Sequence, residues 1–154
     1  MRLYLVQHGE ALAREVDPDR PLSEKGRTEV GRMAAMLAGH VSVTQVLHSG
    51  KTRARQTAEL LAVKLADGAP VEQMEGLAPD DPVAPVAQQF LGEKEDTLVV
   101  GHLPFMARLV TRLISGSEDP AVVSFRPGSV ACLEPADGVS WRLQWMIRPD
   151  LLGW

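Results

Sequence analysis

Two histidines stand directly after short apolar segments of this 154-residue sequence. His8 follows residues 3–7, and His102 follows residues 97–101. Short apolar segments of this kind are typical of buried strands. Because ligands of open α/β sheets bind beyond the carboxyl ends of the strands, we expect both imidazoles to face one crevice if the two strands are neighbours. Gly9, next to His8, would let the backbone approach an anion closely.

A third segment ends in the same way and leads into a basic sequence. Residues 43–48 are apolar enough for a strand, Ser49-Gly50-Lys51 follows, and Arg53 lies about one turn into the helix expected next. A glycine before a helix N-terminus makes a good anion site, because free N–H groups point outward there. The guanidinium of Arg53 is suited to grip two phosphate oxygens. Two imidazoles, a guanidinium and backbone donors are the groups that phosphoryl transfer needs.

Strand-like and helix-like segments alternate along the chain and would hold these residues in place. Ser23 can cap a helix whose apolar positions extend to Leu37, and a second helix should begin near Lys51. The remaining expected elements are a short strand at 71–74, a short helix reaching Leu91, a helix from Pro104 to Ile114, and a closing hairpin of 129–134 and 141–147. This order predicts one α/β domain over residues 1–154, with parallel strands first and an antiparallel hairpin last.

Composition and charge restrict the class of protein. The net charge of −4 argues against a general binder of nucleic acid or of anionic membranes. Cys132 is the single cysteine and lies in an apolar segment, so we expect a buried structural thiol and a reducing compartment. Neither a signal peptide nor a membrane-spanning segment is recognisable. We therefore expect a cytoplasmic protein that acts as a monomer.

Four motifs in order resemble the histidine phosphatase superfamily, the group of phosphoglycerate mutases and acid phosphatases, and among these the small SixA-type phosphohistidine phosphatases. The family pattern is Arg-His-Gly after the first strand, Ser-Pro-x-x-Arg-Ala-x-Gln-Thr after the second, and a later Gly/Ser-His. This sequence has His8-Gly9, Arg20-Pro21-Leu22-Ser23 with Gly26, Ser49 to Thr57 with Arg53-Ala54-Arg55-Gln56-Thr57, and Gly101-His102-Leu103-Pro104. The likeness extends over nearly the whole chain.

The resemblance implies a three-layer α/β/α sandwich like that of phosphoglycerate mutase, and a metal-independent phosphatase without a cofactor. His8 would be the nucleophile and would form a phosphohistidine intermediate that water hydrolyses. Arg53 would hold the phosphoryl group, and His102 would donate to its oxygens. The phosphate or another tetrahedral oxyanion would occupy the pocket.

Two positions depart from the family pattern: Gln7 replaces an arginine, and Gly50 replaces a proline. The loss of a charge-assisted grip on phosphate would weaken transition-state binding about tenfold to a hundredfold. Another cation could compensate, and the candidates are Lys51 first, then Arg20 and Arg126. The residues expected to bind phosphate are Gln7, Gly9, Ser49, Lys51 and Arg20.

No single residue stands out as the acid that protonates a leaving group. The carboxylates considered are Glu10, Asp17, Asp80 and Asp81, with Glu10 and Asp80 as the main candidates. A phosphohistidine substrate needs little help of this kind, because its leaving imidazole is far less basic than an alkoxide. The loops between the motifs are short, which suits a phosphoryl group displayed on another protein. We therefore expect a phosphohistidine phosphatase acting on a phosphorylated protein of a phosphorelay or phosphotransfer system.

Two alternatives remain open from the sequence. One is a phosphatase of small phosphate esters, since an open site also fits small substrates. The other is a catalytically weak domain that only binds phosphorylated partners, because Gln7 replaces the family arginine.

Overall fold

The computed structural model describes all residues, Met1–Trp154, and contains one six-stranded sheet. Its strands are β1 (Leu3–Gln7), β2 (Gln45–His48), β3 (Val71–Gln73), β4 (Thr97–Gly101), β5 (Val130–Pro135) and β6 (Trp141–Ile147). They lie in the order β3-β2-β4-β1-β5-β6. β1 to β4 are parallel to their neighbours, whereas β5 pairs antiparallel with both β1 and β6. The expected mostly parallel sheet with a closing hairpin is confirmed.

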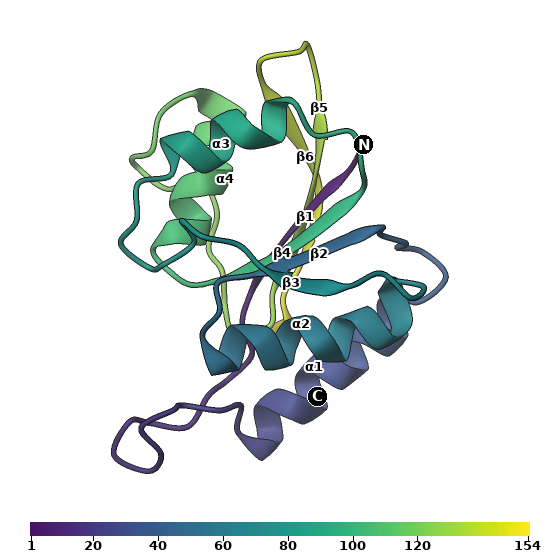
Figure 1. Ribbon diagram of the computed structural model, residues 1–154, viewed down its shortest axis with the longest axis vertical. Coiled ribbons are helices and arrows are strands. Elements are labelled where there is room, and N and C mark those ends of the chain that lie inside the picture. The colour runs from purple at the N-terminus through teal and green to yellow at the C-terminus, as the bar shows by residue number, and fades with distance from the viewer.

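Helices cover both faces of this sheet (Figure 1). On one face lie α1 (Glu24–Leu37) and α2 (Thr52–Leu65), side by side, and on the other lie α3 (Ala84–Leu91) and α4 (Phe105–Ser115). A short 3-10 helix, Pro149–Leu151, follows the hairpin and was not expected from the sequence. The three layers of the predicted α/β/α sandwich are therefore present. None of the helices combines the length and the hydrophobicity that a membrane span requires.

Each face of the sheet has its own apolar core. One core joins α1 and α2 to alternate residues of the strands, such as Tyr4 and Val6 of β1. The other joins α3 and α4 to the intervening residues, such as Leu3 and Leu5. Every residue of β1 and of β4 is buried, because both strands lie in the middle of the sheet with helices above and below. The two strands that precede the histidines are thus completely enclosed by the fold.

Some predicted boundaries differ from the structure for identifiable reasons. β2 begins at Gln45 rather than at residue 43, because the N–H of Val43 donates to Leu65 O and that of Thr44 donates to Asp96 O. The predicted cap of α1 is correct: the Ser23 hydroxyl accepts the Gly26 N–H at 3.0 Å. Cys132 is buried in β5, and burial raises the pKa of its thiol to about 11.

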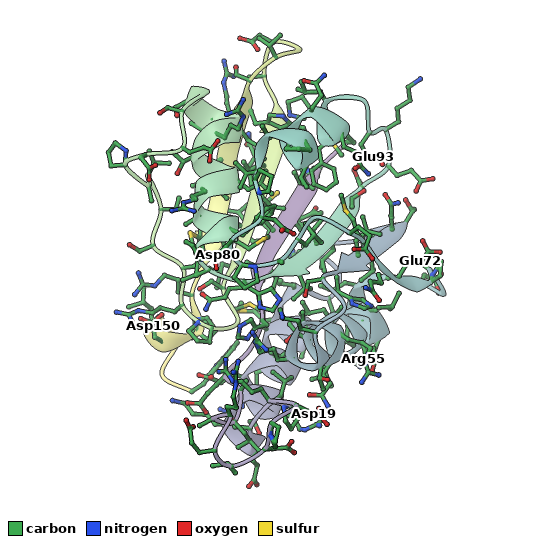
Figure 2. The ribbon with its side chains drawn as sticks, turned by 60° about the vertical axis from the view of Figure 1, so that its left-hand side comes forward. Asp19, Arg55, Glu72, Asp80, Glu93 and Asp150 are labelled. Carbon is green, nitrogen blue, oxygen red and sulfur yellow. The ribbon has the colours of Figure 1, made fainter.

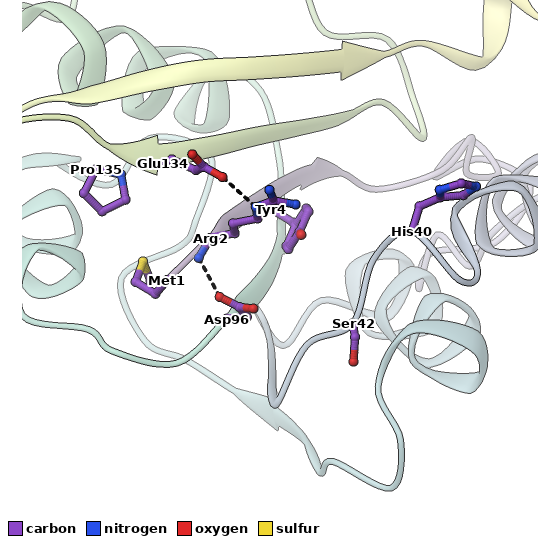
Figure 3. Close-up of a pocket in the computed structure, with 8 residues that line it drawn as sticks. All are labelled: Met1, Arg2, Tyr4, His40, Ser42, Asp96, Glu134 and Pro135. Atoms are coloured by element: carbon purple, nitrogen blue, oxygen red, sulfur yellow. Dashed lines mark hydrogen bonds and ion pairs between the residues drawn. The ribbon is translucent and has the colours of Figure 1, made fainter.

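A hollow of about 670 Å³ opens at the sheet edge where the parallel strands begin (Figure 3). Its polar groups are largely engaged with one another. Arg2 Nε lies 2.6 Å from a carboxylate oxygen of Glu134, and the Arg2 N–H donates to Asp96 at 2.6 Å. These contacts tie the start of β1 to its two neighbouring strands, so we assign this hollow a structural role.

Candidate active site

The register of the two central strands brings His8 and His102 together. Gln7 pairs with Gly101 across β1 and β4, and the His8 N–H donates to Gly101 O at 3.0 Å. Each histidine is the first residue after its strand, at the same edge of the sheet. Their imidazole rings lie 5.0 Å apart between centroids, at an angle of 54°. The shared crevice expected from the sequence is therefore present.

The hydrogen bonds of His8 define which ring nitrogen is free to react. Its Nδ1 lies 2.7 Å from the carbonyl oxygen of Gly9, which can only accept, so Nδ1 carries the proton. In the neutral ring, Nε2 then holds a lone pair. Arg53 Nε lies 3.3 Å from Nε2 and donates toward it. His8 thus presents a nucleophilic nitrogen directly beside a guanidinium.

Both imidazoles are neutral at pH 7. Burial lowers the pKa of His8 to about 4, and the nearby charges of Arg53 and Arg20 act in the same direction. Burial likewise lowers the pKa of His102 to about 3, and the His8 ring and the charges of Arg53, Lys51 and Arg20 act in the same direction. A neutral imidazole is the form required of a nucleophile, and a neutral donor ring costs less to keep buried.

Thr57 fixes Arg53 relative to the end of β1. Its hydroxyl donates to the Arg53 carbonyl at 2.8 Å, one turn earlier in α2, and accepts the Gly9 N–H at 3.0 Å. Thr57 is fully buried. The residue before it, Gln56, accepts the N–H of Leu22 with Oε1 at 2.8 Å. These contacts explain, in structural terms, the Gln-Thr pair that ends the motif from Ser49 to Thr57.

His102 is held by Ser49, which follows β2. The Ser49 hydroxyl lies 2.6 Å from His102 Nε2, whereas His102 Nδ1 is buried without a partner. A buried N–H without a partner is costlier and rarer than a buried acceptor, so we assign the proton to Nε2. His102 then donates to Ser49 and has a proton to offer to an oxygen in the crevice.

The side chains of His8 and His102 line a cavity of about 490 Å³ at this edge of the sheet. Gln7 also lines it: its amide oxygen is buried without a partner, and its amide nitrogen has no hydrogen bond to the protein. The only charged side chains in the lining are Glu10, Arg20 and Arg53. The complete lining is Gln7, His8, Glu10, Ala11, Arg20, Arg53, Pro79, His102, Leu103 and Pro127.

Glu10 is oriented by the residue that caps α1. Ser23 donates from its hydroxyl to Glu10 Oε2 at 2.6 Å, and the Ser23 N–H donates to the Glu10 carbonyl at 2.9 Å. Gly26 lies against the same backbone, since a Cβ there would approach Glu10 O to 2.1 Å. The carboxylate is therefore held at the cavity wall with one oxygen engaged and one free.

Several sequence-based assignments need correction at this level. The Gly9 N–H is taken by Thr57, so it cannot bind phosphate; the glycine is needed because a Cβ would lie 2.7 Å from Val30. Lys51 is exposed and outside the cavity lining, as is Asp80, which Figure 2 labels on the loop after β3. Ser49 contacts His102 rather than the cavity. The anion cradle expected at the start of α2 is thus not part of the cavity.

Other residues of the site were not found by sequence reasoning. Pro79 and Pro127 line the cavity from loops far apart in the chain. Nothing in their local sequence indicates a site, because only the fold brings these loops together. No group of three or more His, Cys, Asp and Glu side chains is arranged to hold a metal ion.

The family comparison agrees with this geometry. Residues 3–79 match the model of the histidine phosphatase superfamily, branch 1. That segment contains His8, Arg53 and the loop with Arg20, while His102 lies beyond it. No curated protein sequence matches the chain significantly.

Solved structures match the chain over almost its full length. The protein histidine phosphatase SixA complexed with tungstate is 29% identical, with a TM-score of 0.85 and 99% of each chain covered. A protein assigned as SixA from Nakamurella multipartitia is 25% identical, with a TM-score of 0.77 and coverage of 96% of this chain and 95% of that chain. Phosphoserine phosphatase of Entamoeba histolytica, at 15% identity and a TM-score of 0.75 over 98% of each chain, shares the fold.

Proposed function

Because the chain belongs to branch 1 of the histidine phosphatase superfamily and is a phosphatase, we propose that its substrate is phosphohistidine on another protein. The protein carrying that phosphohistidine would belong to a phosphorelay or phosphotransfer system. The proposal includes a cytoplasmic location, where a lone reduced thiol such as that of Cys132 is usual.

One observation carries the proposal: His8 lines the cavity and has an unprotonated Nε2 beside Arg53. The proton of His8 lies on Nδ1, 2.7 Å from Gly9 O, and Arg53 Nε donates to Nε2 at 3.3 Å, a hydrogen bond that a bound phosphoryl group would replace. A phosphoryl group bound by Arg53 would thus have its phosphorus in reach of a neutral nucleophile. The similarity to SixA, a protein histidine phosphatase that binds the tetrahedral oxyanion tungstate, supports the same assignment.

The reaction follows from these positions in two steps. The substrate ring takes up a proton from water on its unphosphorylated nitrogen, His8 Nε2 attacks phosphorus, and the phosphorus–nitrogen bond breaks so that the substrate leaves as a neutral imidazole. Water then attacks the phosphoryl group on His8, which releases inorganic phosphate and regenerates the neutral ring. In both transition states His102 would donate from Nε2 to a phosphoryl oxygen while the Ser49 hydroxyl stays beside Nε2 and holds the ring in place.

The shortage of acids in the cavity favours a nitrogen-linked substrate. Glu10 is the only carboxylate in the lining, and Ser23 occupies its Oε2. An alkoxide leaving group needs a proton at once, whereas an imidazole is a much weaker base and is readily protonated by water near pH 7. A phosphohistidine substrate is therefore the one that this lining serves with the least help.

The test compares two substrates in one assay. A protein phosphorylated on histidine and a simple aryl phosphate are incubated with the wild-type enzyme, with His8→Ala and with His40→Ala. His40 is an exposed histidine at the opposite edge of the sheet and serves as the matched control. We expect rapid loss of phosphohistidine with wild type and His40→Ala, slow ester turnover, and no hydrolysis by His8→Ala.

Other outcomes would overturn the proposal. Rapid ester hydrolysis with phosphohistidine left intact would identify a phosphatase of small phosphate esters. Binding of the phosphorylated protein without hydrolysis would identify a phosphate-binding domain.

A further inference from the structure

The neutral residues that line the cavity cannot balance the negative charge of a phosphoryl group. A phosphoryl group brings about two negative charges, yet His8, His102 and Gln7 are all neutral. Arg53 and Glu10 carry opposite charges, so together they contribute nothing to the net charge of the lining. Arg20 is the remaining charged lining residue, and it alone makes the lining positive. We propose, on the basis of the phosphatase function proposed above, that Arg20 is the second guanidinium that grips the phosphoryl oxygens.

The backbone at Arg20 holds this side chain in an unusual way. Its φ is 48°, and it is the one non-glycine residue of the chain with a positive φ. L-residues other than Asn and Asp rarely adopt this left-handed conformation, which costs free energy. Strain of this kind persists at functional sites, where the rest of the fold enforces it. The residue in this strained conformation is one of those that line the cavity.

The hydrogen bonds of Arg20 leave its outer nitrogens free. Its Nε donates to Leu12 O at 3.0 Å, within the loop that joins β1 to α1. The terminal nitrogens have no protein partner, and the ion pairs of the chain involve Arg2, Arg55, Arg112 and Arg148. Arg53 likewise has no carboxylate partner. Two unneutralised guanidinium groups at one cavity are costly unless an anion joins them, and each can offer parallel N–H donors to oxygen.

The charge of Arg20 acts on all three reacting groups. It contributes to the lowered pKa of His8, of His102 and of Arg53, whereas the charge of Lys51 contributes to that of His102 alone. The other cations considered from the sequence are placed differently: Lys51 is exposed beside the cavity, and Arg126 lines an adjoining hollow of about 260 Å³ with Lys25 and Asp150. Arg20 is thus the cation that replaces the charge missing at Gln7.

The test removes the guanidinium at position 20 and then introduces one at position 7, since both residues line the cavity. Arg20→Gly removes the charge while suiting the positive φ, and Arg20→Asn repeats the test if the glycine variant does not fold. Binding of inorganic phosphate is measured by calorimetry for the parent, for Arg20→Gly, and for the double variant Gln7→Arg/Arg20→Gly. Arg27→Ala, which removes an exposed arginine of α1 outside the cavity, is the control for net charge.

We expect Arg20→Gly to bind phosphate about 10- to 100-fold more weakly than the parent, and Arg27→Ala to bind it within about twofold. The double variant should regain at least tenfold, since Gln7 lines the same cavity. Unchanged phosphate binding in Arg20→Gly would overturn the inference, and so would a loss that Gln7→Arg does not restore. Because the probe is inorganic phosphate, this result is independent of whether phosphohistidine is the substrate.

Discussion

The hydroxyl of Ser49 lies 2.6 Å from Nε2 of His102, the nitrogen that faces a phosphoryl group in the proposed reaction. This contact joins the end of β2 to the end of β4, whose strands are adjacent and parallel in the sheet. It holds the buried ring, whose other nitrogen has no partner, in a single orientation.

We predict that Ser49→Ala lowers kcat more than it changes KM. Loss of one hydrogen bond of about 1 kcal/mol corresponds to about fivefold in rate, if the ring then samples other orientations. Ser49→Thr keeps the hydroxyl and should keep kcat within about twofold. Steady-state kinetics on an aryl phosphate measure both. Equal kcat for Ser49→Ala and wild type would show that Ser49 does not position His102.

The pH dependence of activity should reflect the lowered pKa of the nucleophile. Because the pKa of His8 is about 4 in the folded protein, the ring is neutral throughout the range from pH 5 to pH 8. We predict that kcat/KM, corrected for ionisation of the substrate, stays level from pH 8 down to about pH 5 and falls as the pH approaches 4. A decline centred near 6.5, the ordinary value for histidine, would contradict this assignment.

The same groups predict how stability changes with pH. Both histidines have folded-state pKa values below the ordinary value of 6.5, so between about pH 4 and 6.5 the unfolded chain binds more protons than the folded one. The free energy of unfolding must therefore fall as the pH is lowered through this range. Urea denaturation at pH 7 and pH 5 measures the difference, which should be smaller in a His8→Ala/His102→Ala variant. A difference of the same size in that variant would exclude these two rings as its source.

Two glycines of α1 provide a matched test of how the loop carrying Glu10 is held. A Cβ at Gly26 would lie 2.1 Å from the Glu10 carbonyl oxygen, whereas a Cβ at Gly31 would meet nothing within 4 Å. We predict that Gly26→Ala lowers the free energy of unfolding by about 2 kcal/mol or more and reduces activity, since the Glu10 loop must move. Gly31→Ala should stabilise the helix by about 0.5–1 kcal/mol with unchanged activity. Similar stabilities of the two variants, measured in urea, would contradict the close packing.

Much of the fold could be predicted from local patterns because the site-bearing strands are central and mostly apolar. Residues 3–6 and 98–100 are apolar without interruption, and the structure places them in β1 (Leu3–Gln7) and β4 (Thr97–Gly101), as predicted. The pairing of His8 with His102 followed from one general property of parallel sheets, that their carboxyl ends share an edge.

The predictions that are wrong concern residues whose surroundings depend on contacts between segments far apart in the sequence. Gly9 was expected to approach an anion, but Thr57, 48 residues later, accepts its N–H. Lys51 was preferred over Arg20 as a compensating cation because it is adjacent to Gly50 in sequence. The structure places Arg20 in the cavity through a strained backbone and a contact with Leu12, neither of which has a signature in the sequence.

The role of His8 as the nucleophile is tested by locating the phosphoryl group on the enzyme during turnover. The enzyme is mixed with a protein phosphorylated on histidine, quenched in alkali to preserve phosphohistidine, and examined by peptide mass spectrometry and by phosphorus NMR. We predict a phosphoryl group on Nε2 of His8 in the wild type and none at this position in His8→Ala. Undiminished turnover by His8→Ala, or a phosphoryl group on any other residue as the sole intermediate, would contradict it.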